Sequence, residues 1–308
     1  MNRVLDNGIL RVEVDPDRGG AVVAVTHLGL GRQVMARPPW GAPTLDGPTD
    51  RAEDEVEWLA RWPGGWPVMI PNAGDASDGQ GFHGEGSVAR WDASQDDGAV
   101  LLRRSLVSAP ARMERRLSLR GNTLHLDAIL AAVAPCSVIW GEHVTLGADL
   151  VAGPVRLATS AARAEASADY APPESPLSPG TAATWPTLPG REAPVDLSRP
   201  GMGWSTLACL QELGPAPWVE VRREDEAWGV RIEWSPDPWP LAWLWIETGG
   251  DAATPWLGRG RALGVEPCTT WGPTGLAQAR ARGAPLLQLT TDRPRVARLA
   301  LRVFRTNT

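Results

Sequence analysis

Short runs in which apolar and polar residues alternate recur along the chain, and they constrain its fold more than any other feature. In residues 228–234, four apolar side chains alternate with Gly, Arg and Glu, and residues 8–14 and 298–303 show the same period of two. This is the period of a β-strand that buries one face. Further strand-like runs are 21–25, 99–106, 113–119, 123–130 and 137–146. Many short strands with Gly or Pro between them predict an all-β protein, a large antiparallel β-sandwich or barrel, of which we expect the sandwich.

Few helices are expected. Four acidic residues between positions 50 and 55 precede an apolar stripe that includes Trp58 and Trp62, which predicts a short helix over 50–62. Residues 272–282 offer a second short helix, and the almost continuously apolar run 241–247 is typical of a central strand.

The stretch 171–203 contains eight prolines and is interpreted as a long connection rather than a packed element. It could join two β-domains. We expect instead one domain over residues 1–308, because the strands before this stretch do not form a closed set and the candidate chemistry falls on both sides of it.

Charge and cysteine content exclude several classes of function. The net charge is −6, and all thirty basic residues are Arg because the sequence contains no Lys. An acidic chain without a basic cluster is a poor binder of nucleic acid or anionic membranes. The three scattered cysteines are typical of buried thiols in a reducing compartment. With no signal-peptide core and no membrane-spanning apolar run, we expect a soluble, cytoplasmic protein. Its oligomeric state, monomer or homodimer, stays open.

Residues 65–91 form the most unusual segment. Gly, Pro, Asn and Asp run through it up to His83, one of only four histidines. This composition indicates irregular backbone, and loops of such length in a compact domain usually have a function. The alternative interpretation is a surface loop closed by a core tryptophan.

Two other places could carry chemistry. His143 follows Gly141-Glu142 within an apolar strand, and Glu266 follows a short apolar run and precedes Pro267. A Glu before Pro is expected to point into a cleft, because proline stops the hydrogen-bond ladder there. Alternatively, His143 is a hydrogen-bonded core histidine and Glu266 an exposed strand-end carboxylate. The four histidines lack metal-ligand spacing, and no phosphate-binding loop or nucleophile elbow occurs, so we expect no metal site.

Together these segments resemble one family, the aldose 1-epimerases or mutarotases of the galactose mutarotase-like superfamily. The motifs that carry the resemblance occur in family order: Asp15-Pro16-x-x-Gly19-Gly20, Pro71-Asn72, His83-Gly84-Glu85, Gly141-Glu142-His143 and Gly264-Val265-Glu266-Pro267. Each motif is short, and the specificity comes from their order across almost the whole chain.

The resemblance implies a galactose mutarotase-like supersandwich and an isomerase of carbohydrate metabolism that interconverts sugar anomers. It assigns Glu266 as the base, His143 as the acid toward the ring oxygen, and His83 as a hydrogen-bond donor. General acid–base chemistry needs no metal or redox cofactor, so a small-molecule sugar is the only expected partner. The expected substrate-binding residues are Asn72, Glu85, Trp66, Trp204 and Trp245, the last three being possible stacking surfaces among sixteen tryptophans.

Two alternatives remain open at this stage. The same cleft could bind or sense a carbohydrate without turnover, or it could catalyse another sugar isomerase or lyase reaction. The first is favoured by departures from the family pattern: Ala73 stands where many members have Arg, and Val144, Thr145 and Leu146 stand where aromatic residues are usual.

Overall fold

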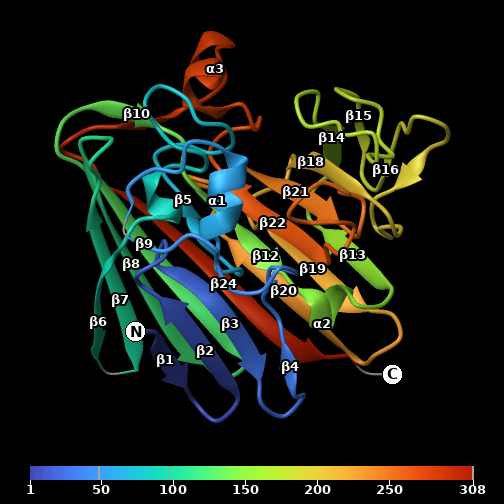
Figure 1. Cartoon of the computed structure of the whole chain (residues 1–308), viewed down its shortest axis with the longest axis horizontal. Coiled ribbons are helices and arrows are strands. Elements are labelled where there is room, and N and C mark those ends of the chain that lie inside the picture. Colours follow the sequence, from blue (N-terminus) through green and yellow to red (C-terminus); the bar gives the residue numbers. More distant parts are fainter. Residues whose placement is uncertain (48, 97, 307–308) are drawn as a thin grey trace.

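The computed structural model describes residues 1–47, 49–96 and 98–306, and most of its ordered elements are antiparallel strands (Figure 1). The helical elements of this described part are α1 (Glu55–Arg61), α2 (Ala148–Val151), α3 (Gly275–Ala281) and the 3-10 helix η1 (Glu85–Ser87). The expected all-β fold with few short helices is therefore confirmed.

Two eight-stranded sheets make up most of the molecule. The first, called sheet I, has the order β15-β14-β18-β21-β22-β11-β5, with β12 also paired to β22. Its strands are β5 (Val68–Met69), β11 (Gly141–Glu142), β12 (Val144–Leu146), β14 (Arg163–Ala166), β15 (Ala182–Thr184), β18 (Ser205–Gln211), β21 (Leu241–Glu247) and β22 (Ala262–Cys268). The apolar run 241–247 is a central strand, as predicted.

The second, called sheet II, has the order β13-β19-β20-β24-β9-β8-β7-β6. Its strands are β6 (Asp92–Asp96), β7 (Ala99–Ser105), β8 (Ala111–Arg120), β9 (Thr123–Ala132), β13 (Val155–Thr159), β19 (Trp218–Arg223), β20 (Trp228–Trp234) and β24 (Arg295–Arg305). In β8, β9 and β24 buried and more exposed residues alternate, because successive side chains point to opposite faces of the sheet.

Three smaller sheets complete the fold. The N-terminal sheet contains β1 (Arg3–Asp6), β2 (Leu10–Asp15), β3 (Ala21–His27) and β4 (Arg32–Gln33). The two-stranded sheets pair β10 (Cys136–Val138) with β23 (Leu287–Leu289), and β16 (Thr187–Leu188) with β17 (Val195–Asp196).

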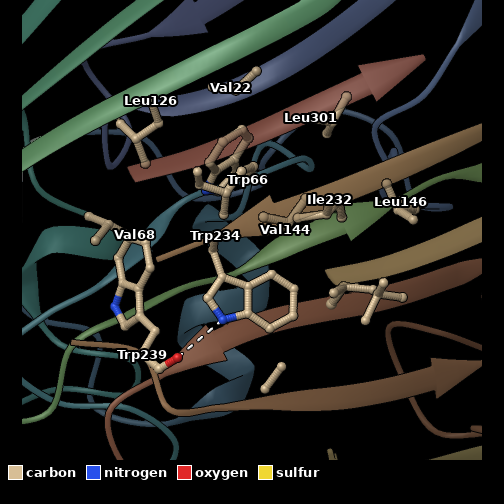
Figure 2. Packing of buried hydrophobic residues seen from close by; sticks show 14 of the residues in the cluster. Val22, Trp66, Val68, Leu126, Val144, Leu146, Ile232, Trp234, Trp239 and Leu301 are labelled. Carbon is tan, nitrogen blue, oxygen red and sulfur yellow. Dashed lines mark hydrogen bonds between the residues drawn. The ribbon is translucent and has the colours of Figure 1, made fainter. Parts of the chain in front are cut away.

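The core lies between the two large sheets. Val68 and Val144 of sheet I belong to one buried cluster with Leu126 and Ile232 of sheet II, and Figure 2 shows these side chains close together. Val22 of the N-terminal sheet joins the same cluster. The inward faces of both sheets are apolar, so face-to-face packing removes both from water, as in other β-sandwiches.

Some predicted boundaries need correction. The run 137–146 is not one strand but three short ones, β10, β11 and β12, each with a different pairing. The predicted helix over 50–62 is shorter: it starts after Asp54, whose side chain accepts the amide of Glu57 and caps the helix.

The proline-rich stretch 171–203 is also more packed than predicted. It supplies β15, β16 and β17, and its Leu177 and Leu197 are buried in the same cluster as Leu5 and Val303. Proline breaks the stretch into short strands but does not prevent its apolar side chains from being buried. The expectation of one domain over residues 1–308 stays a prediction.

Candidate active site

A cavity opens over the central strands of sheet I. Its empty space, including the solvent at its open mouth, measures about 710 Å³. Strands β18, β21 and β22, helix α1 and the loop before η1 all contribute lining residues. His83, His143 and Glu266, which lie far apart in the sequence, all line it.

His143 and Glu266 face each other across adjacent strands. His143 is the single residue between β11 and β12, and both of these strands pair with β22 in one register, which places His143 opposite Glu266. Nε2 of His143 lies 3.5 Å from Oε1 of Glu266, and the two side chains are only 7% and 2% exposed. A proton donor and acceptor are thus held close together away from bulk water.

The prediction that the strand ends at Pro267 is wrong, although Glu266 does point into a cavity. The strand does not stop there: β22 continues to Cys268, with Pro267 opposite Ala242 of β21. Only on the other side is the ladder interrupted, opposite His143. Proline has no N–H to donate to that side. On the β5 side, His143 donates its backbone N–H to the carbonyl of Pro67, at 3.0 Å, in the register of the β5–β11 pairing.

His83 enters the cavity from the loop before η1. Its backbone has φ +57°, in the left-handed region that few non-glycine residues adopt. Its Nδ1 accepts the backbone N–H of Gly74 at 3.0 Å, so in neutral His83 the proton is on Nε2. The rings of His83 and His143 lie 5.0 Å apart between centroids.

Burial sets the protonation of these three groups. It raises the pKa of Glu266 to about 8 and lowers the pKa of His143 to about 4. Burial, reinforced by His143, lowers the pKa of His83 well below its usual value. Near neutral pH, therefore, Glu266 and His143 together hold one transferable proton and His83 is uncharged.

Tryptophan rings cover much of the remaining wall. Trp58, Trp62, Trp243, Trp245 and Trp256 all line the cavity. The ring of Trp58 lies edge-on to His83 at 4.9 Å, and its Nε1 donates to Ser87 Oγ at 2.9 Å. Trp245 packs against both smaller apolar clusters of the structure. Such rings present flat faces suited to the C–H surfaces of a sugar.

The charged lining residues other than the catalytic candidates are all acidic. They are Glu55, Asp75 and Asp169, and within the described residues no Arg lines the cavity. Asp169 is paired with Arg282 at 2.5 and 2.9 Å. Burial raises the pKa of Glu55, and the negative charges of nearby carboxylates, including Asp75, raise it further. Loss of water and the charge of Asp169 raise the pKa of Asp75.

Of the five predicted substrate-binding residues, Trp245 lines the cavity and four lie elsewhere. Asn72 is fully buried beneath the loop. Its Nδ2 donates to the carbonyls of Asp75 and Gly81, and its Oδ1 accepts from the amide of Leu276 in α3. Two of these hydrogen bonds hold the loop together, and the third fastens it to α3.

Glu85 also serves the fold. Arg104 Nε and the backbone amides of Val107 and Ser108 donate to its buried carboxylate, which ties η1 to the β7–β8 connection. Glu142, adjacent to His143, points to the opposite face of its strand. There it accepts a hydrogen bond from Nη2 of Arg115.

Trp66 and Trp204 also lie outside the cavity and make contacts within the fold. Trp66 is fully buried in the core and donates its Nε1 to Glu142 Oε2 at 2.8 Å. Trp204 is half-buried, packs against the main core cluster, and donates its backbone N–H to Thr248 Oγ1. The number of tryptophans in the sequence could not show which of them line the cavity and which pack in the core.

Sequence reasoning missed several lining residues. Trp58 and Trp62 were predicted on the apolar face of a helix, and that face turns out to cover the cavity. A signal for them existed, because the helix immediately precedes the unusual loop. Tyr170 gave no such signal: it comes from the connection after β14, and its hydroxyl lies 3.1 Å from Ser205 Oγ.

No cluster of three or more His, Cys, Asp or Glu side chains with metal-binding geometry occurs among the described residues. Within that same part of the chain, none of the helices has the length and apolar character needed to cross a membrane.

By sequence, neither a family model nor a curated protein matches the chain. Structural comparison does find relatives. The Slr1438 protein from Synechocystis sp. PCC 6803 superposes with TM-score 0.68 at 15% identity, over 100% of this chain and 96% of that one. The GalM/aldose epimerase homologue from C. elegans gives 0.66 at 14%, over 100% of both chains. A galactose mutarotase related enzyme from Lactobacillus acidophilus gives 0.63 at 13%, over 100% and 98%. By fold, this chain is galactose mutarotase-like over its whole length.

Proposed function

We propose that the protein interconverts the α and β anomers of an unphosphorylated aldose by general acid–base catalysis. The observation that carries the proposal is the approach of His143 Nε2 to Glu266 Oε1, at 3.5 Å, inside a tryptophan-lined cavity. The names of two structural relatives, an aldose epimerase homologue and a galactose mutarotase related enzyme, support the same chemistry.

The reaction needs one group that takes a proton and one that gives a proton. Glu266 removes the proton of the anomeric hydroxyl while His143 protonates the ring oxygen, and the ring opens to the free aldehyde. Rotation about the C1–C2 bond turns the carbonyl over, and the ring closes with the two roles reversed. Each proton transfer typically contributes about 10²–10⁴ in rate.

The single proton of the pair suits this cycle. With the proton on His143, Glu266 is a carboxylate base; with the proton on Glu266, the two groups are ready for the reverse step. Neutral His83 donates from Nε2 to the ring oxygen or to a neighbouring hydroxyl, because its Nδ1 is already engaged with Gly74.

The charge of the cavity supports an unphosphorylated substrate. Phosphate groups are usually bound by Arg, Lys or helix N-termini. Here Glu55 and Asp75 stand in the lining, and the nearby Arg282 is paired with Asp169. A sugar phosphate entering this cavity would meet like charges.

The test is NMR exchange spectroscopy of anomers over a panel of aldoses, with glucose and galactose compared with their 6-phosphates. We expect exchange above the buffer rate for at least one free aldose and slower exchange for its phosphate. Binding of an aldose with exchange no faster than in buffer would contradict catalysis and favour a binding or sensing protein on the same scaffold.

The pH dependence gives an independent check. The rate needs one proton on the Glu266–His143 pair, so kcat/KM should follow a bell between pH of about 4 and about 8. Below the lower limb both groups hold a proton, and above the upper limb neither does. A rate that rises steadily through pH 9 would rule out this pair as the acid–base machinery.

A further inference from the structure

The imidazole of His143 is held at both of its nitrogens. Nε2 faces Glu266, and Nδ1 lies 2.7 Å from the hydroxyl oxygen of Thr145. A flip of the ring about its χ2 angle would put Cδ2 in the place of Nδ1 and Cε1 in the place of Nε2, so both contacts would be lost. The contact with Thr145 favours the one orientation in which Nε2 is left for the carboxylate, whichever of the two atoms Nδ1 and Oγ1 carries the proton.

Thr145 is rigidly placed for this contact. It lies two residues after His143 on an extended backbone, so the two side chains project to the same face. Thr145 is fully buried, and its carbonyl accepts the amide of Ala36 at 2.9 Å. Its hydroxyl has one further contact, a long one of 3.5 Å to the carbonyl of His143. A β-branched side chain in a strand has few rotamers, so the hydroxyl stays where the strand puts it.

Gly264 is the cross-strand partner of Thr145 in β22. A Cβ built on Gly264 would overlap Oε1 of Glu266, the same atom that faces His143, and would press on Cβ of Trp245 at 3.2 Å. The backbone of Gly264 does not have a positive φ, so conformational freedom is not the reason for a glycine here. Its missing side chain leaves the space that the carboxylate occupies.

We propose that Thr145 and Gly264 are a positioning pair for the proposed anomerase reaction: Thr145 orients the imidazole of His143, and Gly264 makes room for the carboxylate of Glu266. Neither residue is among those that line the cavity, so we assign them a positioning role rather than a catalytic one. This inference rests on the proposed function for its kinetic test, but the orientation of the imidazole can be measured without turnover.

The kinetic test compares Thr145→Val, which removes the hydroxyl and keeps the shape, with Thr145→Ser, which keeps the hydroxyl. Thr145→Val should lower kcat by about 10²-fold, the usual cost of misplacing a catalytic group by about 1 Å, with KM close to wild type. Thr145→Ser should restore most of kcat. Gly264→Ala should lower kcat in the same way, since its methyl group displaces the carboxylate.

Thr206→Val is the matched control. Thr206 is a buried threonine of β18 in the same sheet, and its hydroxyl lies 2.7 Å from Ser175 Oγ. If Thr206→Val lowers kcat as much as Thr145→Val, the loss reflects a buried hydroxyl in general and the proposal is overturned. It is also overturned if Thr145→Val keeps the wild-type kcat.

NMR of the imidazole nitrogens separates this inference from the proposed function. The charged and titratable groups around His143 are Glu266 of β22 and His83 of the loop, while Glu142 points away. In Thr145→Val, the Nδ1 resonance and pKa of His143 should change while those of His27 and His125 do not. An unchanged His143 would refute the role of Thr145. A wild-type protein that turns over no aldose would contradict the proposed function alone.

Discussion

Two buried glutamates on neighbouring strands have opposite surroundings. Glu142 and Glu266 are 0% and 2% exposed. Glu142 accepts hydrogen bonds from Arg115 at 2.7 Å and Trp66 at 2.8 Å, and these partners oppose the rise of its pKa that burial causes. Glu266 faces His143, and burial raises its pKa to about 8.

The difference separates a carboxylate held in an ion pair from the one that we propose as the general base. Burial still raises the pKa of Glu142, but the guanidinium of Arg115 favours its charged form and opposes that rise. A carboxylate left without a cation in the same low-dielectric interior has a pKa close to the working pH, where a general base is most useful. The sequence around each glutamate does not reveal this difference, because both belong to motifs of the family resemblance: Glu142 precedes His143, and Glu266 precedes Pro267.

The largest expected effect is on catalysis. Glu266→Gln keeps the shape of the side chain but cannot take a proton, so the rate of anomer exchange should fall by about 10²–10⁴-fold while sugar affinity is retained. Anomer exchange by NMR and sugar binding by calorimetry measure the two quantities on one sample. In the control, Glu142→Gln, the folded protein should exchange anomers within a few-fold of wild type. Equal losses of exchange rate in Glu266→Gln and Glu142→Gln would contradict the different roles of the two glutamates.

The second effect is on stability. Arg115→Met leaves the Glu142 carboxylate buried without its cation, which typically costs about 3–5 kcal/mol. The free energy of unfolding from urea titration should fall accordingly. Adding Glu142→Gln to Arg115→Met should recover part of the loss, because the unpaired charge is gone. No recovery in the double variant would show that Arg115 acts through packing rather than through charge.

The third effect is the pH dependence of stability. The folded-state pKa of Glu266 is raised from 4.5 to about 8, so between these values the folded protein keeps a proton that the unfolded chain loses. Stability from this group therefore falls as pH rises through that window, by an amount on the order of a few kcal/mol. His143, with its pKa lowered from 6.5 to about 4, contributes the opposite trend: stability falls as pH drops below 6.5.

Glu266→Gln should remove only the alkaline decline. Relative to wild type, the variant should gain stability at pH 8 and change little at pH 5, as measured by urea unfolding at both values. Parallel pH curves for the two proteins would mean that the Glu266 carboxyl ionises as easily in the folded state as in the unfolded chain.

The smallest expected effect is on sugar affinity, and it distinguishes tryptophans that line the cavity from those that lie outside it. Trp245→Leu removes a cavity-lining ring and should weaken sugar binding by about 0.5–1.5 kcal/mol, the usual value of an aromatic contact beyond its area. Trp204→Leu, at a position predicted from sequence but placed outside the cavity, should leave affinity unchanged. Calorimetric titration of both variants with one aldose decides the comparison, and equal weakening would put Trp204 in contact with the sugar.

The sequence predicted the parts of the fold that depend on local pattern. The period of two over 228–234 coincides with β20 to the residue, because a strand with one buried face must alternate. It could not predict that 137–146 breaks into three strands, since that depends on distant partners: β10 pairs with β23, β11 with β5 and β22, and β12 with β22.

The candidate site divides in the same way. His83, His143 and Glu266 were identified by motif order, and the structure brings all three to one cavity. Asn72 and Glu85 also belong to motifs of the family resemblance, but their side chains lie outside the cavity. Asn72 is hydrogen-bonded to the backbone, and Glu85 is hydrogen-bonded to Arg104. Whether a polar residue next to a motif faces ligand or loop depends on contacts between distant segments, which a single sequence does not contain.

The position of β22 in sheet I also has a consequence for biosynthesis. β22 fills the space between β21 and the pair β11 and β12, and it is made about 120 residues after β12. At about 5–20 residues per second, a ribosome needs roughly 6–24 s to add that length. During this interval β11 and β12 lack the partner strand with which they pair in the folded protein, and unpaired strand edges are prone to aggregation. The step that pairs β11 and β12 with β22 therefore also brings Glu266 to His143.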